Sequence, residues 1–174
     1  VQENRIDEAA ALCHTTNPLP EMCGRVCPQD RLCEGSCTLE DGFGAVTIGA
    51  VEKYIVDAAL AEGWNPDVST AQPTGKRVAI VGAGPAGLEA ARVAAERGHE
   101  VVVFEAANSP GGQIRLTAQS ERRREMISII DWRMSQCAKL GVTFHFNTWA
   151  EADTVLAEKP DVAIVATGGL PHTE

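Results

Sequence analysis

The chain has 174 residues, of which 44% are hydrophobic, which is enough for one ordinary domain or for one domain plus a small appendage. Its formal net charge of −9 argues against a nucleic-acid groove or an anionic membrane surface as partner. No signal peptide is visible and no apolar run approaches the roughly 20 residues that span a bilayer, so we expect a cytoplasmic protein. The first residues, without an initiator Met, are expected to be the interior of a longer polypeptide.

Residues 1–68 are predicted to form a small helical domain rich in cysteine. Two helical patterns, at about 5–14 and 48–64, flank an irregular stretch that contains many Pro, Gly and Cys residues. The second pattern carries apolar residues at helical spacing. Residues 65–75 combine Pro, Gly, Ser, Thr and Asn, which is typical of a linker.

Four of the six cysteines fall in one short segment, with the spacing C-x3-C-x5-C-x3-C: Cys23, Cys27, Cys33 and Cys37. Nothing indicates secretion, so we interpret them as reduced or metal-bound rather than as disulfides. Zinc sites usually contain a C-x2-C element, which is absent, whereas C-x3-C-P occurs in iron–sulfur proteins, whose clusters take soft thiolate ligands. The spacing favours an iron–sulfur site, with zinc and unliganded thiols as alternatives. Cys13 and Cys137 stand alone and are interpreted as small buried hydrophobes.

From residue 76 to 174, strand and helix patterns alternate. This alternation predicts an α/β fold with a parallel sheet covered on both faces, a Rossmann-like dinucleotide-binding domain that follows the helical one. The expected strands are at about 77–81, 101–105, 142–147 and 161–166. The expected helices are at about 85–98, 120–139 and 150–158.

A glycine-rich turn joins the first of these strands to a helix, and Glu105 ends the next apolar run. This spacing is the dinucleotide-binding fingerprint. Glycines at the turn allow a tight bend and let a pyrophosphate approach the backbone closely. The free N–H groups at the start of the helix then face the phosphates. Glu105 would accept hydrogen bonds from ribose hydroxyls and repel a 2′-phosphate, so FAD, NAD or ADP is expected rather than NADP. The alternative is an ordinary strand–turn–helix in which the glycines only allow the turn. That alternative does not explain why an acidic residue, Glu105, follows at this spacing. The expected turn contacts are Gly82, Gly84, Pro85, Ala86 and Gly87.

Other chemistry-bearing side chains are interpreted as structural. No nucleophile or general base is predicted, so no residue is assigned a catalytic role. The three arginines at 122–124 are expected on a solvated face. The tryptophans are expected to pack rather than to form a stacking platform: Trp64, Trp132 and Trp149.

The segments 16–21, 23–37, 43–49 and 51–55 closely resemble the small subunit of bacterial glutamate synthase, and the same module is similar to the N-terminal iron–sulfur domain of dihydropyrimidine dehydrogenase. The resemblance implies two [4Fe–4S] clusters. Cys27 and Cys33 would bind one, with Glu52 in its fourth-ligand region, and Cys37 would bind the other; Cys23 is not expected to be a ligand. The family's upstream cysteine group, C-x2-C-x4-C-x3-C, is absent, so each cluster is expected to lack ligands here. The alternative for Glu52 is a solvated helix carboxylate.

The segments 110–114, 122–126, 131–133 and 165–169 resemble a different group. They are similar to the flavoprotein half of 2,4-dienoyl-CoA reductase, trimethylamine dehydrogenase and dimethylglycine demethylase-type proteins. This resemblance implies that four further residues line the pyrophosphate, the flavin edge or the nearby turn: Gly112, Gln113, Thr167 and Gly168.

The two resemblances together imply part of an electron-transfer flavoprotein. NAD(P)H would reduce FAD, and FAD would pass electrons to [4Fe–4S] clusters, with the rest of the parent polypeptide or a large catalytic subunit as partner. No nucleic-acid or membrane partner is expected. One alternative is part of an iron–sulfur old-yellow-enzyme-type reductase or amine demethylase. Another is a non-catalytic fragment that binds ADP or a dinucleotide.

Overall fold

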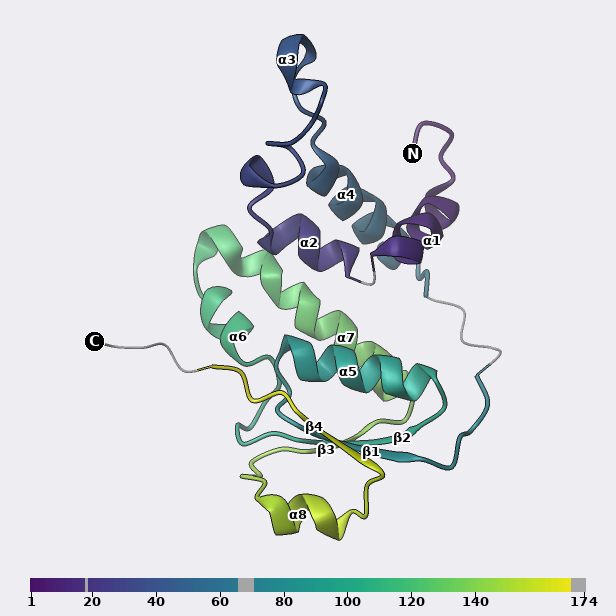
Figure 1. Cartoon of the computed structure of the whole chain (residues 1–174), viewed down its shortest axis with the longest axis vertical. Helices are drawn as coiled ribbons and strands as arrows, with labels where there is room; N and C mark the ends of the chain where they lie inside the picture. The colour runs from purple at the N-terminus through teal and green to yellow at the C-terminus, as the bar shows by residue number, and fades with distance from the viewer. Residues whose placement is uncertain (18, 66–70, 170–174) are drawn as a thin grey trace, which may run out of the picture. The chain divides into compact units, whose positions relative to one another are not determined.

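The computed structural model describes residues 1–17, 19–65 and 71–169. The chain forms two compact units, Val1–Asp67 and Val68–Glu174, whose helices and strands are labelled in Figure 1. The first unit is helical, and the second contains a parallel sheet. The fold class expected from the sequence is therefore confirmed, whereas the domain limits 1–68 and 76–174 stay predictions.

The first unit is built around α4 (Ile48–Ala61), against which α1 (Ile6–Thr16) and α2 (Pro20–Val26) pack. Its apolar core joins α1 to α4 through Ile6, Ala10, Ile55 and Ala59. α2 is tied to α4 by the Arg25 guanidinium, whose Nη2 donates to both carboxylate oxygens of Asp57, at 2.7 and 2.8 Å. Such two-oxygen contacts of Arg fix direction as well as distance, so α2 enters the cysteine segment at a set angle.

The stretch between the two expected helices contains short helical elements that were not expected, although turns and loops make up most of it. It contains α2, the 3-10 turn η1 (Gln29–Arg31) and the short α3 (Glu40–Phe43). Each of these elements is too short to show a repeated apolar stripe. Pro20 occupies the first turn of α2, where its missing N–H group has no consequence.

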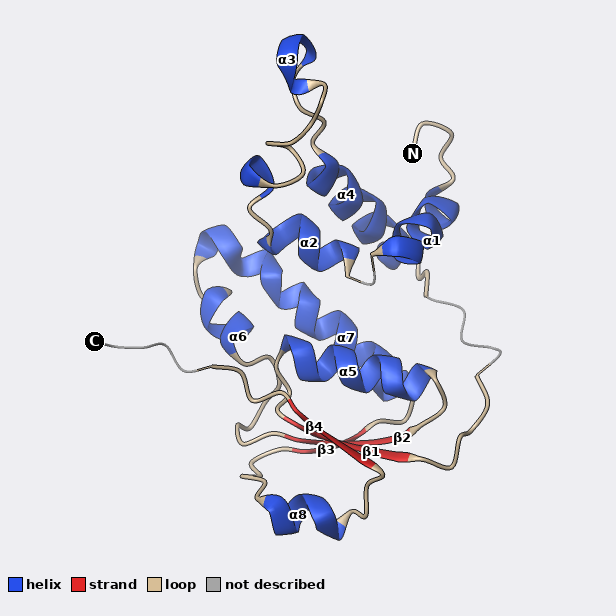
Figure 2. Ribbon diagram, viewed as in Figure 1, coloured by secondary structure: helices blue, strands red, loops and turns tan. Residues whose placement is uncertain are grey.

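The second unit is a four-stranded parallel sheet in the order β3-β2-β1-β4. Its α-helices lie on both faces of the sheet: α5 and α7 cover one face and α8 covers the other (Figure 2). The elements are β1 (Arg77–Val81), α5 (Pro85–Glu96), β2 (Glu100–Phe104), α6 (Gln113–Thr117), η2 (Glu121–Ile127), α7 (Ser128–Lys139), β3 (Thr143–His145), α8 (Ala152–Ala157) and β4 (Val162–Val165).

The expected elements of this unit are present, with two differences. α6 was not expected, because five residues carry no recognisable period. The helix expected at 120–139 is divided into η2 and α7. The apolar stripe begins only at Met126, and the three preceding arginines are exposed, as expected.

Residues at the start of β1 are bonded to a residue just before β4, far away in the sequence. Lys76 Nζ lies 2.8 Å from Asp161 Oδ1, and the Arg77 N–H donates to Asp161 Oδ2 at 2.9 Å. These contacts hold the start of β1 beside the start of β4, and they lower the pKa of the Asp161 carboxyl. Among the residues that the structure describes, no helix is both long and apolar enough to cross a membrane.

Candidate functional site

The carboxyl ends of the strands form one edge of the sheet, and the residues of the fingerprint gather there. β1 lies between β2 and β4, so the strand order reverses at β1: β2 and β3 lie on one side of it and β4 lies on the other. In open parallel sheets, ligands bind in the crevice at such a switch point. The turn before α5, the segment after β2 and the segment after β4 all meet here (Figure 1).

At two glycines of the turn a side chain would collide with nearby backbone atoms, whereas at a third glycine the surrounding space is free. Gly82 has a φ of +104°, and a Cβ atom there would lie 2.5 Å from the carbonyl oxygen of Ala166. A Cβ atom at Gly87 would overlap the carbonyl oxygen of Gly82, so only glycine lets α5 pack this closely on the turn. A Cβ atom at Gly84 would meet nothing within 4 Å. The backbone at the start of α5 is therefore open to close approach at Gly84, as a helix N-terminus that binds a phosphate requires.

The carboxylate of Glu105 is held against this turn. Its Oε2 accepts a hydrogen bond from the Ala83 N–H at 2.8 Å, and its Oε1 accepts one from the Ala107 N–H at 2.8 Å. Each carboxylate oxygen has a further lone pair, so Glu105 can still accept from a ribose diol. The acid is thus oriented before any ligand arrives.

The segment after β2 returns to the same place. The Gly111 N–H donates to the Ala83 carbonyl at 2.8 Å, and a Cβ atom at Gly112 would lie 3.3 Å from Gly84 Cα. Gln113 Nε2 donates to the carbonyl of Gly169 at 2.8 Å and so links this segment to the one after β4.

The residues predicted to contact a cofactor are brought together at one edge, although their roles stay predictions. Pro85 and Ala86 form the first turn of α5, and Thr167 and Gly168 follow β4. The backbone groups that complete the arrangement were missed from the sequence, because a peptide N–H or C=O gives no side-chain signal: Ala83, Ala107, Gly111 and Gly169.

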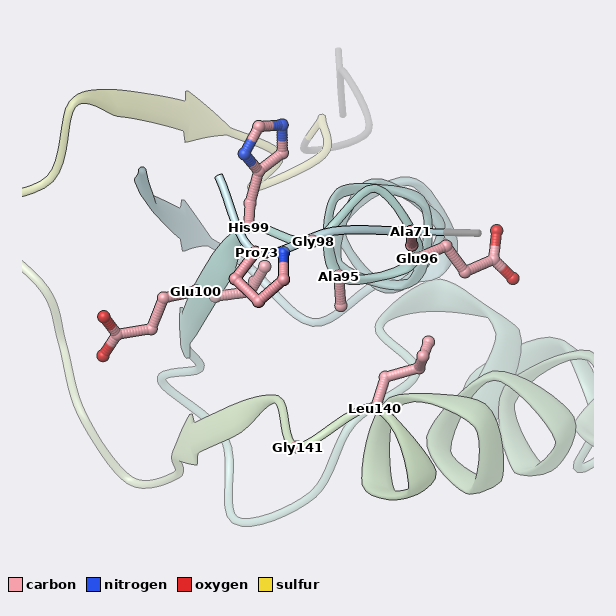
Figure 3. A pocket seen from close by; sticks show the side chains of 10 residues that line it. Ala71, Pro73, Ala95, Glu96, Gly98, His99, Glu100, Leu140 and Gly141 are labelled. Carbon is pink, nitrogen blue, oxygen red and sulfur yellow. The ribbon is translucent and has the colours of Figure 1, made fainter. Parts of the chain in front are cut away.

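A cavity of about 400 Å³ lies at the other end of α5, away from the glycine turn. It is lined by the end of α5, the start of β2 and the segment after α7 (Figure 3). Its polar side chains already have partners: Glu96 pairs with Arg92, His99 with Thr74 and Glu100 with Arg77. Figure 3 shows these three lining side chains pointing away from one another. The cavity therefore offers no convergent set of polar groups.

The cysteine segment places its thiols in two environments. Cys27 is exposed, but partial loss of solvation, followed by the neighbouring Cys23 and Cys33 thiols and Glu52, raises the pKa of its thiol. Hydrogen bonds from backbone groups, first Val46 and then Leu39, lower the pKa of the Cys37 thiol; the Val46 N–H lies 3.5 Å from Cys37 Sγ. The resemblance predicts that Cys27, Cys33 and Glu52 belong to one cluster and Cys37 to the other.

These residues do not fit a complete cluster by themselves. Over residues 1–17, 19–65 and 71–169, no three His, Cys, Asp or Glu side chains are grouped as metal ligands. A [4Fe–4S] cluster takes four protein ligands. The roles of Cys27, Cys33, Cys37 and Glu52 therefore stay predictions.

Two further expectations concern isolated residues. Cys137 is fully buried, so its interpretation as a small buried hydrophobe is confirmed, while Cys13 is half-buried. Trp64 packs on the core of the first unit, and Trp132 lies against Arg92, with 5.3 Å between the guanidinium carbon and the ring centroid. Trp149 is 80% exposed, so the expectation that it packs is wrong.

Comparison with known proteins supports the division into two parts. Residues 1–64 match the family model of dihydropyrimidine dehydrogenase domain II, a 4Fe–4S domain, and residues 80–138 match the NAD(P)-binding Rossmann-like domain. The first match supports an iron–sulfur cofactor, and the second supports a bound dinucleotide. A solved structure of 2-naphthoyl-CoA reductase is 39% identical, with a TM-score of 0.56, over 67% of this chain and 18% of that one.

Two curated relatives match different shares of the chain. The glutamate synthase [NADPH] small chain of Halomonas elongata is 51% identical over 177 aligned residues, which cover 100% of this chain and 37% of that protein. A probable N-methylproline demethylase of Rhizobium meliloti is 81% identical over 99 residues, 57% of this chain and 15% of that protein. The chain thus spans much less than half the length of these relatives. Its homologues include the glutamate synthase small chain and a probable N-methylproline demethylase, and its two parts are an iron–sulfur-type helical domain and a Rossmann-like domain.

Proposed function

We propose that the chain is part of a cytoplasmic, FAD- and iron–sulfur-dependent oxidoreductase of the glutamate synthase small-chain type. In the whole protein, electrons would pass from NAD(P)H through FAD to iron–sulfur clusters, with a large catalytic subunit as partner. The observation that carries this proposal is the match to the glutamate synthase small chain over 100% of this chain, through both the helical part and the Rossmann-like part.

The role of this chain's own residues is to bind and orient a dinucleotide. The start of α5 and the open space at Gly84 would receive the pyrophosphate, and Glu105 would hold the ribose. Bound FAD would supply the redox chemistry, and the residues named here would bind and orient it. Cys27, Cys33 and Cys37 would contribute thiolates to clusters whose remaining ligands lie elsewhere.

Replacing Glu105 tests the dinucleotide site. In the E105Q variant the ribose diol loses a charged acceptor, so ADP binding should weaken about tenfold, measured by isothermal titration calorimetry. The preference for NAD⁺ over NADP⁺ should also narrow, because a neutral amide no longer repels the 2′-phosphate. E100Q is the matched control, since Glu100 begins the same strand at the opposite edge of the sheet.

The outcomes separate the candidate functions. A wild-type chain that binds neither ADP nor FAD, or an E105Q chain that binds ADP as the wild type does, would contradict the proposed site. A chain that retains ADP but releases FAD on desalting would favour the non-catalytic nucleotide-binding alternative.

A second candidate is part of an iron–sulfur old-yellow-enzyme-type reductase or amine demethylase. The 81% identity with the probable N-methylproline demethylase over 99 residues favours it. The neighbouring coding sequence discriminates between the two. A further four-cysteine group upstream would favour the glutamate synthase type, whereas a barrel domain upstream would favour the reductase or demethylase type.

A further inference from the structure

An exposed tryptophan lies in a connection whose backbone is hydrogen-bonded to the segment of Glu105, the acid of the candidate dinucleotide site. Trp149 lies in the connection between β3 and α8, at the same edge of the sheet as the glycine turn (Figure 1). Its indole is 80% exposed. The side chain contributes little burial to the free chain, although burying a large aromatic ring is strongly favourable. Its position is therefore not explained by the core.

The backbone around Trp149 is tied to the segment that carries Glu105. The Glu105 N–H donates to the His145 carbonyl, the Thr148 N–H donates to the Glu105 carbonyl, and the Asn147 N–H donates to the Ala107 carbonyl, each at 2.9 Å. Ala107 also donates its N–H to the Glu105 carboxylate. Trp149 thus follows directly on a connection that is fixed to the acid by three backbone hydrogen bonds.

The other side of this connection is anchored in the core. Ala150, the next residue, packs with Phe104 and Val155 on the sheet face that α8 covers. The backbone at Trp149 is therefore held from both sides, while its side chain stays outside the core. The backbone that carries the ring therefore need not be ordered when a ligand stacks on the ring.

The covalent order of a nucleotide determines what would reach this ring. If the pyrophosphate lies at the start of α5 and the ribose at Glu105, the base continues beyond Glu105, away from the glycine turn. The connection bonded to Glu105 on that side is the one that ends in Trp149. Bases stack on aromatic side chains.

We propose that Trp149 is the platform on which the adenine base of the bound nucleotide stacks. This inference rests on the proposed dinucleotide site.

The test compares a ligand that has the base with one that lacks it. Binding of ADP and of inorganic pyrophosphate is measured by calorimetry on the 174-residue chain and on its W149A and W149F variants. W149A should weaken ADP binding about tenfold, in line with the usual contribution of base stacking, and should leave pyrophosphate binding unchanged. W149F should recover most of the ADP affinity, because phenylalanine keeps an aromatic face.

Two controls accompany these variants. L156A removes another exposed apolar side chain of the same unit, in α8, and should bind ADP as the wild type does. In the wild type, ADP should quench part of the tryptophan fluorescence; in W149F, where Trp64 and Trp132 remain, that quenching should be lost. Circular dichroism should be the same for all variants.

The possible failures are distinguishable. If the wild type binds ADP and W149A binds it equally well, the stacking role is overturned and the dinucleotide site stands. If W149A weakens ADP and pyrophosphate equally, Trp149 acts on the fold of the site and the stacking role is likewise overturned. If the wild type binds neither ligand, the proposed site fails and this inference fails with it.

Discussion

Burial divides the cysteines into chemically different groups. Cys137 lies in α7 with its Sγ 3.8 Å from the carbonyl oxygen of Leu88 in α5. Burial raises the pKa of its thiol to about 11, whereas Cys27 and Cys33 are exposed. Thiolate is the reactive form of cysteine, so position in the fold decides which of these residues can react or bind a metal.

Alkylation measures this difference directly. At pH 8 the thiol of Cys137 stays protonated, because this pH lies well below its pKa of about 11, and burial blocks access. Iodoacetamide should therefore label Cys33 in the native chain and Cys137 only after unfolding in urea, as read by peptide mass spectrometry. Rapid native labelling of Cys137 would contradict the packing of α7 on α5.

At the scale of elements, the turn between β1 and α5 assigns different tasks to neighbouring glycines. In a G87A variant the new methyl group would overlap the Gly82 carbonyl oxygen, so α5 must move from the turn. We expect a loss of about 1–3 kcal/mol in the free energy of unfolding, as for other overpacked sites, measured by urea denaturation.

G84A is the matched partner of this variant. Gly84 has a φ of −73°, which alanine tolerates, and free space around its missing Cβ. The unfolding free energy should fall by less than about 1 kcal/mol, the order of a changed helix cap, while the methyl group obstructs the pyrophosphate and ADP binding is lost. Equal losses of stability in G84A and G87A would contradict the division of roles.

Elements with a strong local signature could be predicted from the sequence, and short ones could not. The fingerprint led to β1, the turn and α5, because turn geometry and strand–helix packing restrict these positions to glycine. α2 and α6 were missed because seven and five residues show no apolar period. Side chains of the candidate site were predicted, but the exposure of Trp149 was not, since it depends on how the connection after β3 is held by distant residues.

At the scale of the whole molecule, the cysteine-rich unit has an incomplete set of cluster ligands. The part of the chain that the structure describes groups no three potential metal ligands, although residues 1–64 match a 4Fe–4S domain. The match to a 4Fe–4S domain is compatible with the lack of three grouped ligands if other parts of the parent protein supply the remaining ligands.

Reconstitution distinguishes these situations. After anaerobic incubation with iron, sulfide and FAD and subsequent desalting, the chain should retain less than one full [4Fe–4S] complement, determined by iron and sulfide analysis and visible absorption. A chain that keeps a full cluster, with absorption that bleaches on reduction, would show that its own side chains suffice. The C37A variant would then identify whether Cys37 takes part.

The pairing of β1 with β4 has a consequence for how the second unit forms. The contacts of Lys76 and Arg77 with Asp161 span more than 80 residues of sequence, and among the described strands β4 comes last in the chain. Contacts between residues so far apart slow folding, because a long loop must close before they form. During synthesis, β1 emerges early yet has to wait for β4 before one of its two edges is covered, which leaves a hydrogen-bonding edge open to wrong partners in the interval.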